Sequence, residues 1–307
     1  MESLAIQTTG LSKSFLDVPA VIDLSLIVRR GELYGLVGPD GSGKSTTMRL
    51  LAGILEPSSG DALVAGFSIR SAPEAIKDRI GYMSQRFGLY EDLTVRENIL
   101  FYADLYEVPK RERPARIERL LGFSNLTPFE KRLAGALSGG MKQKLGLACA
   151  LIHTPEVLLL DEPTNGVDPV SRRDFWKILY DLLRQGVTVF VSTAYLDEAE
   201  RCTRIGLMHK GRIIIDDDPQ KVRRSLGAPM VEIWTDQVRK AGDVARAMPD
   251  VVGVGMYGDR LHIGLAARET AASVIDGLAR EGISVKDYRE ILPSLEDVFI
   301  SMVKDIS

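Results

Sequence analysis

The residues from Gly38 to Ser45 have the types and spacing needed to bind a chain of phosphates. They fit the pattern G-x-x-x-x-G-K-[ST], and the expected binding set is Gly38, Asp40, Gly41, Ser42, Gly43, Lys44, Ser45 and Thr46. Glycines let the backbone turn its N–H groups toward phosphate oxygens, and the helix that follows adds partial positive charge. Lys44 is expected to reach the β- and γ-phosphates, and Ser45 to coordinate Mg²⁺. The alternative is a glycine-rich turn that binds nothing.

A second candidate feature is a pair of adjacent carboxylates, Asp161 and Glu162. They follow the apolar run 157–160, which predicts a fully buried strand. Ligands of open α/β sheets bind at the carboxyl ends of the strands, so these side chains are expected beside the phosphates. Asp161 is expected to hold Mg²⁺ through water, and Glu162 to orient or deprotonate an attacking water. The competing interpretation is ordinary surface charge at a strand end.

Alternating strand and helix patterns are expected to position these residues. Apolar runs predict strands at 32–37, 80–84, 157–160 and 187–192, and helical spacing predicts helices at 45–54, 95–105, 110–121, 139–152 and 169–185. Short strands are also expected before residue 30, with a hairpin over 205–216. Strands that alternate with helices favour an α/β fold with a mainly parallel sheet.

The pattern changes after Gly227-Ala228-Pro229, a sequence typical of a boundary. Strands are then expected at 231–234, 251–256, 260–265 and 284–291, with helices at 237–248 and 269–281. This order, β, α, β, β, α, β, matches a ferredoxin-like module. A last helix is expected over 295–303, where Ser294 and Asp297 have the spacing of a variant capping box. The sequence therefore predicts domains at 1–227 and 229–307.

The overall composition is that of an ordinary globular protein. The 307 residues are 45% hydrophobic and 26% charged, and the net charge of −3 offers no global basic field for nucleic acid. No apolar run approaches the roughly 20 residues that span a bilayer, and the N-terminus lacks the pattern of a secretory signal. The 2 cysteines and 3 histidines show no metal-ligand spacing, which favours reduced cysteines in a cytoplasmic protein.

A further motif, Leu137-Ser138-Gly139-Gly140-Met141, lies about twenty residues before the run that ends in Asp161-Glu162-Pro163. This order of motifs, with the phosphate loop before them, resembles the ABC ATPases over roughly residues 4–225. The resemblance implies a P-loop NTPase fold with a mainly parallel sheet, an antiparallel β subdomain and a helical subdomain at about 87–155. The module at 229–307 would then be a small α+β accessory or dimerisation domain.

The resemblance also assigns roles to individual positions. Ser138, Gly139 and Gly140 would contact ATP held by another copy of the domain, so that two chains share one active site. Gly166-Val167-Asp168-Pro169 matches a loop that crosses the dimer interface, with Asp168 near the partner's nucleotide. Phe15 stands where the family has an aromatic residue on adenine, although a lone Phe more often belongs to a core. The implied catalytic residues are Glu162, Lys44 and Gln85, and the implied metal ligands are Ser45, Gln85 and Asp161.

Ala194 departs from the family pattern. After Val191-Ser192-Thr193 the family usually has a histidine that contacts the γ-phosphate and helps to position water and the catalytic glutamate. Alanine can neither donate a hydrogen bond nor carry charge. Either hydrolysis is slow in a symmetric dimer of this chain, or an ATPase-competent partner supplies the missing group, or the alanine is an engineered change.

Two segments, 90–98 and 292–299, resemble ATP-binding subunits of ABC-2-type exporters, including drug-efflux relatives. The resemblance implies a subunit at the cytoplasmic face of the cell membrane that binds ATP and Mg²⁺ and powers a separate membrane-spanning permease. Its partner would be a second ATP-binding subunit, in a homodimer or a heterodimer with a related chain. ATP-driven closure of this dimer, followed by hydrolysis, would drive export. No nucleic-acid partner is expected, and the transported substrate is not encoded in this chain.

Two other functions are compatible with parts of the sequence. A soluble ABC protein that acts on ribosomes or DNA is disfavoured by the single ATPase unit, the missing coiled-coil insertion and the lack of basic excess. A C-terminal module that senses a small ligand is the other possibility. Because no polar constellation in 229–307 singles itself out, packing or dimer stabilisation is favoured for that module.

Overall fold

The chain divides into two compact units, Met1–Asp216 and Asp217–Ser307. The computed structural model describes residues 3–86, 88–267 and 270–306. The division precedes the boundary expected at 227–229 by about ten residues, because α8 (Pro219–Ser225) packs with α11 (Leu295–Ile306) of the second unit. Residue 87, where the helical region was expected to begin, and Glu269, where a helix was expected to start, lie outside the described residues.

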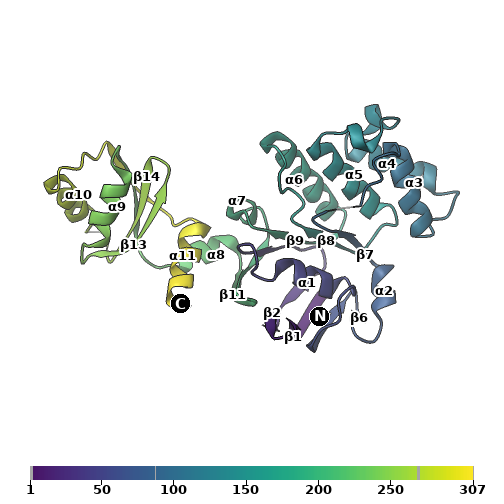
Figure 1. Cartoon of the computed structure of the whole chain (residues 1–307), viewed down its shortest axis with the longest axis horizontal. Helices are drawn as coiled ribbons and strands as arrows, with labels where there is room; N and C mark the ends of the chain where they lie inside the picture. Colours follow the sequence, from purple (N-terminus) through teal and green to yellow (C-terminus); the bar gives the residue numbers. More distant parts are fainter. Residues whose placement is uncertain (1–2, 87, 268–269, 307) are drawn as a thin grey trace. The chain divides into compact units, whose positions relative to one another are not determined.

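A mainly parallel sheet forms the centre of the first unit (Figure 1). Its strands run in the order β11-β10-β4-β9-β8-β7, and the pairs from β10 to β7 are parallel. The bounds are β4 Leu33–Val37, β7 Ile80–Met83, β8 Val157–Asp161, β9 Thr188–Thr193, β10 Arg204–His209 and β11 Arg212–Asp217. Every residue of β4 and β8 is buried, which is why both strands read as continuous apolar runs.

Helices cover both faces of this sheet. In Figure 1, α1 lies on the face shared with the antiparallel strands, whereas α3, α4, α5 and α6 lie on the opposite face. The bounds are α1 Lys44–Leu51, α2 Pro73–Lys77, α3 Val95–Leu105, α4 Arg113–Phe123, α5 Gly139–Leu151, α6 Pro169–Arg184 and α7 Leu196–Ala199, with single 3₁₀ turns at Thr127–Phe129 and Ala134–Ala136. Thr94 and Glu97 form a reciprocal capping box that begins α3.

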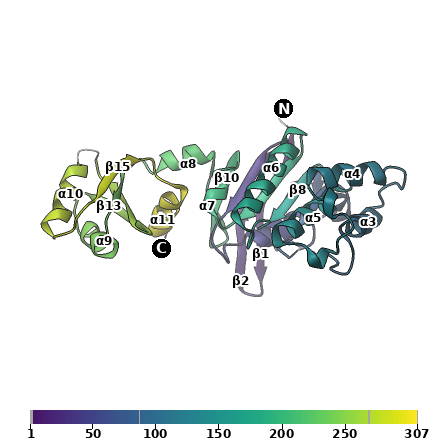
Figure 2. The same ribbon diagram turned by 90° about the horizontal axis from the view of Figure 1, so that it is seen from above.

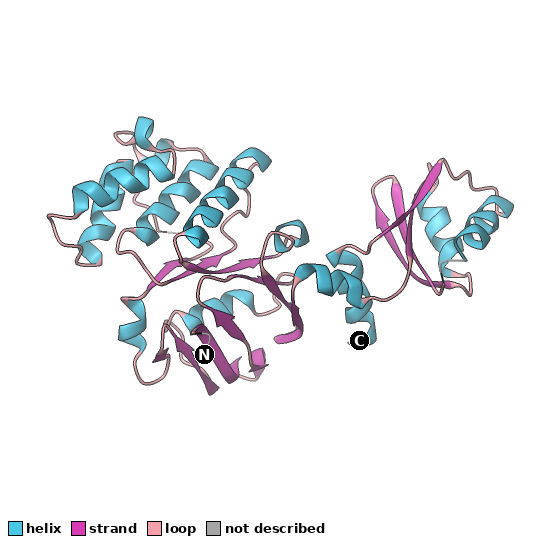
Figure 3. Ribbon diagram, turned by 180° about the vertical axis from the view of Figure 1, so that it is seen from behind, coloured by secondary structure: helices cyan, strands magenta, loops and turns pink. Residues whose placement is uncertain are grey.

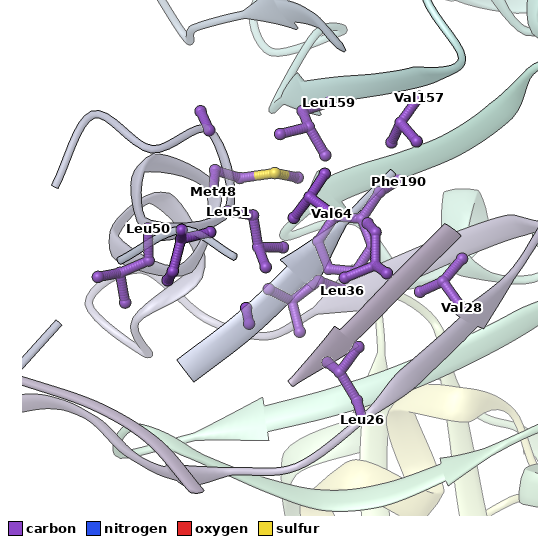
Figure 4. Packing of buried hydrophobic residues seen from close by; sticks show 14 of the residues in the cluster. Leu26, Val28, Leu36, Met48, Leu50, Leu51, Val64, Val157, Leu159 and Phe190 are labelled. Carbon is purple, nitrogen blue, oxygen red and sulfur yellow. The ribbon is translucent and has the colours of Figure 1, made fainter. Parts of the chain in front are cut away.

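An antiparallel sheet lies against α1 and the parallel sheet. Its strands are the magenta arrows around the label N in Figure 3. Its order is β2-β1-β5-β6, with β3 also paired to β1. The bounds are β1 Leu4–Phe15, β2 Val18–Leu24, β3 Ile27–Arg29, β5 Ser59–Val64 and β6 Phe67–Ser68. The core between the two sheets contains Leu26, Val28, Leu36, Met48 and Phe190, all buried (Figure 4). Burial of each such side chain stabilises the fold by about 1.5–3 kcal/mol.

The second unit has the predicted order of elements. Its antiparallel sheet runs β13-β14-β12-β15, which is the strand arrangement of a split βαβ module. The bounds are β12 Met230–Trp234, α9 Val238–Arg246, β13 Val251–Tyr257, β14 Arg260–Leu265, α10 Ala271–Arg280 and β15 Asp287–Ile291. β15 starts three residues later than predicted, and the carbonyl of Ser284 instead accepts a hydrogen bond from the Thr235 hydroxyl at 2.9 Å. α11 is longer than expected.

The two faces of this second sheet differ in chemistry. In Figure 2, α9 and α10 lie on one side of the sheet and α11 on the other. The first face holds an apolar core that includes Val231, Leu261 and Leu278. The opposite face carries a charged group that we call the His262 cluster, defined by Glu232, His262, Arg289 and Asp297.

The His262 cluster joins α11 to the sheet. His262 Nδ1 lies 3.0 Å from Asp297 Oδ2 and His262 Nε2 lies 3.3 Å from Glu232 Oε1. Arg289 Nη2 lies 2.6 Å from the other oxygen of Glu232. Both carboxylates are buried, so each depends on these partners for compensation of its lost hydration.

Among the described residues, none of the helices combines the length and the hydropathy that crossing a membrane requires.

Candidate functional site

The phosphate loop connects β4 to α1, as the motif predicts. Gly41 and Gly43 have φ values of 77° and 110°, which favour glycine. A Cβ atom at Gly43 would also lie 2.3 Å from the carbonyl oxygen of Ala20, so a larger residue does not fit. Within the described ranges, the hydroxyl of Ser42 is buried and has no hydrogen-bond partner. A polar atom of this kind, in a loop that begins a helix, suits an anion that would accept its hydrogen bond.

Lys44 lies buried inside this loop. Its Nζ donates hydrogen bonds to the carbonyl oxygens of Gly38 at 2.8 Å and Pro39 at 3.1 Å. The same nitrogen lies 3.2 Å from Glu162 Oε1, and the two side chains are only 3% and 9% exposed. The structure therefore brings together the cation and the carboxylate that the sequence placed in one site, although 118 positions separate them (162 − 44).

The paired carboxylates lie at the carboxyl end of β8, as the sequence predicts. Asp161 Oδ1 accepts hydrogen bonds from Ser45 at 3.0 Å and from Ser192 at 2.7 Å. Glu162 has φ of 49°, a left-handed conformation that few residues other than glycine adopt. Its main-chain N–H donates to Ser192 Oγ at 3.0 Å. Strained backbone of this kind clusters at functional sites, where the surrounding structure holds it in place.

Gln85 lies at the same strand edge, after β7. Its Nε2 donates to Glu162 Oε2 at 3.0 Å, so in this structure it contacts the second carboxylate rather than Asp161. Ser45 and Asp161 place a hydroxyl and a carboxylate oxygen side by side, a donor set that suits a hard cation such as Mg²⁺. No group of three or more His, Cys, Asp or Glu that could hold a metal occurs in the part of the chain that the structure describes. A divalent ion at Ser45 and Asp161 would therefore need further oxygens from a ligand and water.

The LSGG segment begins α5. Ser138 caps the helix by accepting a hydrogen bond from Met141 N at 3.3 Å. Ser138 and Gly139 are exposed, whereas Gly140 is buried against α6, where a Cβ atom would lie 2.4 Å from the Ser171 side chain. The exposed start of a helix offers free N–H groups and partial positive charge to an external anion.

Two further predicted residues are exposed. Asp168 caps α6 by accepting hydrogen bonds from Val170 N at 3.1 Å and Ser171 N at 2.9 Å. Hydrogen bonds from the Ser171 side chain and backbone lower the pKa of the Asp168 carboxyl. Phe15 ends β1 with 47% of its surface exposed, and Lys13 Nζ lies 5.5 Å from the ring centroid. Phe15 is therefore not a core residue, and about half of its surface remains accessible.

Sequence reasoning did not single out Ser192, Asn165 or Tyr195. Ser192 pairs with Asp161 in the parallel register of β8 and β9, which explains its contact with the carboxylate. Asn165 Nδ2 donates to Glu162 Oε2 at 3.3 Å, and Tyr195 Oη donates to Asn165 Oδ1 at 3.4 Å. Their positions in the sequence could have indicated a place in the site. Asn165 follows β8, Ser192 lies in β9 and Tyr195 follows β9, so all three lie at the sheet edge that also carries the phosphate loop.

Comparison with known proteins agrees with this arrangement. The family model for the ABC transporter matches residues 21–165, and a model for the C-terminal domain of DrrA1-3-like ATP-binding proteins matches residues 218–303. The chain is 42% identical to the "Probable multidrug ABC transporter ATP-binding protein YbhF" of Escherichia coli strain K12, over 99% of this chain and 53% of that protein. It thus spans about half the length of that relative.

Two other proteins resemble the chain over most of their own length. The daunorubicin/doxorubicin resistance ATP-binding protein DrrA of Streptomyces peucetius is 33% identical over 97% of this chain and 92% of that protein. A solved dimer of the ATP-binding cassette MJ0796, in a post-hydrolysis state with ADP and Pi, has a TM-score of 0.63 and 26% identity, and the match covers 69% of this chain and 98% of that one. The fold and site define an ABC ATPase domain, and the chain belongs to the family of ABC transporter ATP-binding proteins.

Proposed function

We propose that this chain binds ATP together with Mg²⁺ and hydrolyses the bond between the β- and γ-phosphates. The observation that carries the proposal is the buried contact of Lys44 with Glu162 at the end of the phosphate loop. A buried cation beside a buried carboxylate, next to a helix N-terminus, suits a polyanion whose cleavage needs a base. Membership in the ABC family supports the same assignment.

The residues divide the work by their chemistry. Lys44 would exchange the carbonyl oxygens of Gly38 and Pro39 for the β- and γ-phosphate oxygens. Glu162 would accept a proton from the attacking water or orient it. Mg²⁺, when bound, neutralises charge that develops on the phosphates, and the residues that would hold it are Ser45, Asp161 and Gln85. The phosphate-binding and adenine contacts are proposed for Phe15, Gly38, Asp40, Gly41, Ser42, Gly43 and Thr46.

The exposed start of α5 supports a site completed by a second copy. Ser138 and Gly139 present helix N–H groups outward, where they can meet the γ-phosphate of ATP bound to a partner chain. Asp168 would lie at the same interface. Two ATP molecules would then favour the closed dimer by their higher affinity for it, and hydrolysis would release it. The partner is proposed to be a second ATP-binding subunit, identical or related.

We further propose that this dimer acts at the cytoplasmic face of the cell membrane, where it powers the separate permease of an ABC-2-type exporter. The names of the two relatives support transport, since they refer to a multidrug ABC transporter and to daunorubicin/doxorubicin resistance. The second unit, matched by the DrrA1-3-like C-terminal model, is proposed to be an accessory or dimerisation domain. Removing residues 218–307, which leaves β11 whole, and measuring ATP-dependent dimerisation by light scattering tests the dimerisation role, because unchanged dimerisation would contradict that role.

Complementation between two inactive variants tests the shared active site. Lys44→Met removes the cation of a chain's own site, and Ser138→Arg fills the helix start that would meet the partner's ATP. Each variant alone is expected to lack ATPase activity, whereas an equimolar mixture is expected to recover part of it. Recovery occurs because one site of each mixed dimer keeps both unaltered halves. If both variants fold and their mixture recovers no activity, the shared site is contradicted. The Ser138→Arg variant should still bind ATP, because its own Lys44 is unaltered, and a loss of ATP binding would show damage to its own site instead.

A further inference from the structure

The Glu162 carboxylate is held by three side chains. Lys44 contacts Oε1 at 3.2 Å, and Gln85 and Asn165 donate to Oε2 at 3.0 Å and 3.3 Å. Under the proposed function, Lys44 turns to the phosphates and Gln85 to the metal when nucleotide binds. Of these three, Asn165 is the donor that has no such role with nucleotide or metal. It can therefore keep the carboxylate in place while the other two are engaged.

Asn165 is itself held in a defined position. Its main-chain N–H donates to the carbonyl of Glu162 at 3.2 Å, which folds the segment back on the end of β8. Its side-chain oxygen accepts a hydrogen bond from Tyr195 Oη at 3.4 Å. The Asn165 amide thus links the Glu162 carboxylate to Tyr195. Its nitrogen donates to Glu162 and its oxygen accepts from Tyr195.

Tyr195 is anchored at both its backbone and its ring. Its main-chain N–H donates to Thr193 Oγ1 at 3.0 Å. The guanidinium carbon of Arg172 lies 4.5 Å from its ring centroid, a cation–π contact. Arg172 Nε lies 3.4 Å from Oε1 of the fully buried Glu198, so the arginine is fixed as well. The hydroxyl is therefore presented to Asn165 by a rigid support rather than by a freely rotating side chain.

The residue beside this tyrosine is Ala194, which is exposed and has no polar side-chain atom. We infer that Asn165, held by Tyr195, is a positioning residue that orients Glu162. It takes over the support for the Glu162 carboxylate that the alanine at position 194 cannot supply. The inference rests on the proposed ATP hydrolysis. Neither residue needs to touch the nucleotide, because both act through the carboxylate.

The direct test measures single-turnover ATP hydrolysis by the full chain with Mg²⁺. Asn165→Ala is expected to lower the rate about tenfold, the effect of one hydrogen bond to a charged group, with unchanged ATP affinity. Tyr195→Phe keeps the ring over Arg172 and is expected to lower the rate about threefold, since its bond is longer and indirect. Tyr180→Phe is the matched control, because the Tyr180 hydroxyl donates to the Arg201 carbonyl at 3.2 Å, and it is expected to leave the rate unchanged.

The separation of rate from affinity distinguishes positioning from a merely structural role. A positioning residue is expected to change the hydrolysis rate and to leave ATP affinity unchanged, whereas a packing defect would lower both. A loss of ATP affinity as large as the loss of rate in Asn165→Ala would overturn the inference.

A double-mutant cycle with Ala194→His completes the test. If the histidine supplies an independent support, Asn165→Ala should cost less in the Ala194→His background than in the unaltered chain. Equal losses in both backgrounds, or no loss in the unaltered chain, would overturn the inference and leave the proposed ATPase intact. No turnover by either parent background would instead contradict the proposed function itself.

Discussion

The two units each contain a group of charged residues with buried carboxylates, and the two groups differ in the partners of those carboxylates. In the first unit, Lys44 has two carbonyl oxygens and Glu162 as partners. The hydroxyl of Ser42, in the same phosphate loop, has no hydrogen-bond partner among the described residues. In the His262 cluster, carboxylates and cations meet on a sheet face and under a helix start. The first group can exchange its partners for a ligand, whereas the second is complete without one.

The contrast extends to backbone conformation. Glu162 has φ of 49°, whereas Glu232 and His262 pair directly across antiparallel strands in regular register. A strained residue persists because its surroundings hold it, and such positions concentrate at functional sites. We therefore expect substitutions in the first group to change activity more than stability, and substitutions in the His262 cluster to do the reverse.

The largest effect is expected from Glu162→Gln. The amide keeps the shape of the side chain but cannot accept a proton, so single-turnover hydrolysis should fall by about 10³-fold. ATP binding and ATP-dependent dimerisation, measured by light scattering, should persist. The free energy of unfolding should change by about 1–2 kcal/mol, because Gln85 and Asn165 can still donate to the amide oxygen and Lys44 keeps its bonds to the carbonyl oxygens of Gly38 and Pro39. A loss of activity that tracks a loss of folded protein would break the contrast between the two groups.

Asp297→Ala is the corresponding change in the second unit. Asp297 accepts hydrogen bonds from Tyr257 at 3.0 Å and Ser294 at 2.6 Å, and it contacts His262. Its removal should lower the stability of this unit by about 3 kcal/mol, since a buried charge loses its partner. Hydrogen exchange, followed separately in peptides of each unit, measures the loss.

Asp259→Ala is the control for this prediction. The Asp259 carboxylate is exposed and lies 3.6 Å from Arg260 Nε, so its removal should cost less than about 0.5 kcal/mol. Equal effects of the two substitutions would show that the His262 cluster contributes no more than a surface ion pair.

Much of the arrangement of the candidate site could be predicted because its residues share one edge of the sheet. A strand before a glycine-rich loop, and another before Asp161 and Glu162, place both groups at the carboxyl ends of parallel strands. The contacts of Ser192 and Asn165 could not be predicted in this way. They depend on the register of β9 against β8 and on the turn after Glu162, which the local sequence does not specify.

The His262 cluster lay beyond sequence reasoning for a related reason. Glu232, His262 and Asp297 are separated by 30 and 35 positions, so no local motif joins them. Cross-strand register brings the first two together, and the start of α11 supplies the third. This is why no polar constellation singles itself out in the sequence of 229–307, whereas the capping pair of Ser294 and Asp297 was visible because it is local.

Titration of His262 should make the second unit pH-dependent. Burial lowers the pKa of this imidazole, but hydrogen bonds and attraction from Asp297 and then Glu232 outweigh burial, so the pKa is raised above 6.5. Because the folded pKa exceeds the unfolded one, this stabilisation is fully present below about pH 6.5 and is lost as pH rises through the raised value.

The expected loss is about 1–2 kcal/mol, the range for hydrogen bonds to charged groups. This loss of stability can be followed by hydrogen exchange in peptides from β12, β14 and α11. The exchange is measured from pH 6 upward and corrected for the intrinsic exchange rate. Arg260 and Arg289 also face Glu232 but keep their charge over this range. His262→Gln should therefore flatten the dependence, and a slope that persists in this variant would assign it to another group.

The smallest effect separates two helix caps that both begin with a serine. Ser294 Oγ accepts from Asp297 N at 3.2 Å, while Asp297 Oδ2 accepts from Ser294 N at 2.8 Å, so the cap is reciprocal. Ser138 makes a single cap bond of 3.3 Å to Met141 N at the exposed start of α5. Ser294→Ala should destabilise its unit by about 1 kcal/mol, whereas Ser138→Ala should cost about 0.5 kcal/mol and mainly weaken ATP-dependent dimerisation. Thermal unfolding and light scattering of both variants test this difference. If Ser138→Ala proved the more destabilising and left dimerisation unchanged, the start of α5 would be a structural cap rather than a surface held open for a partner's nucleotide.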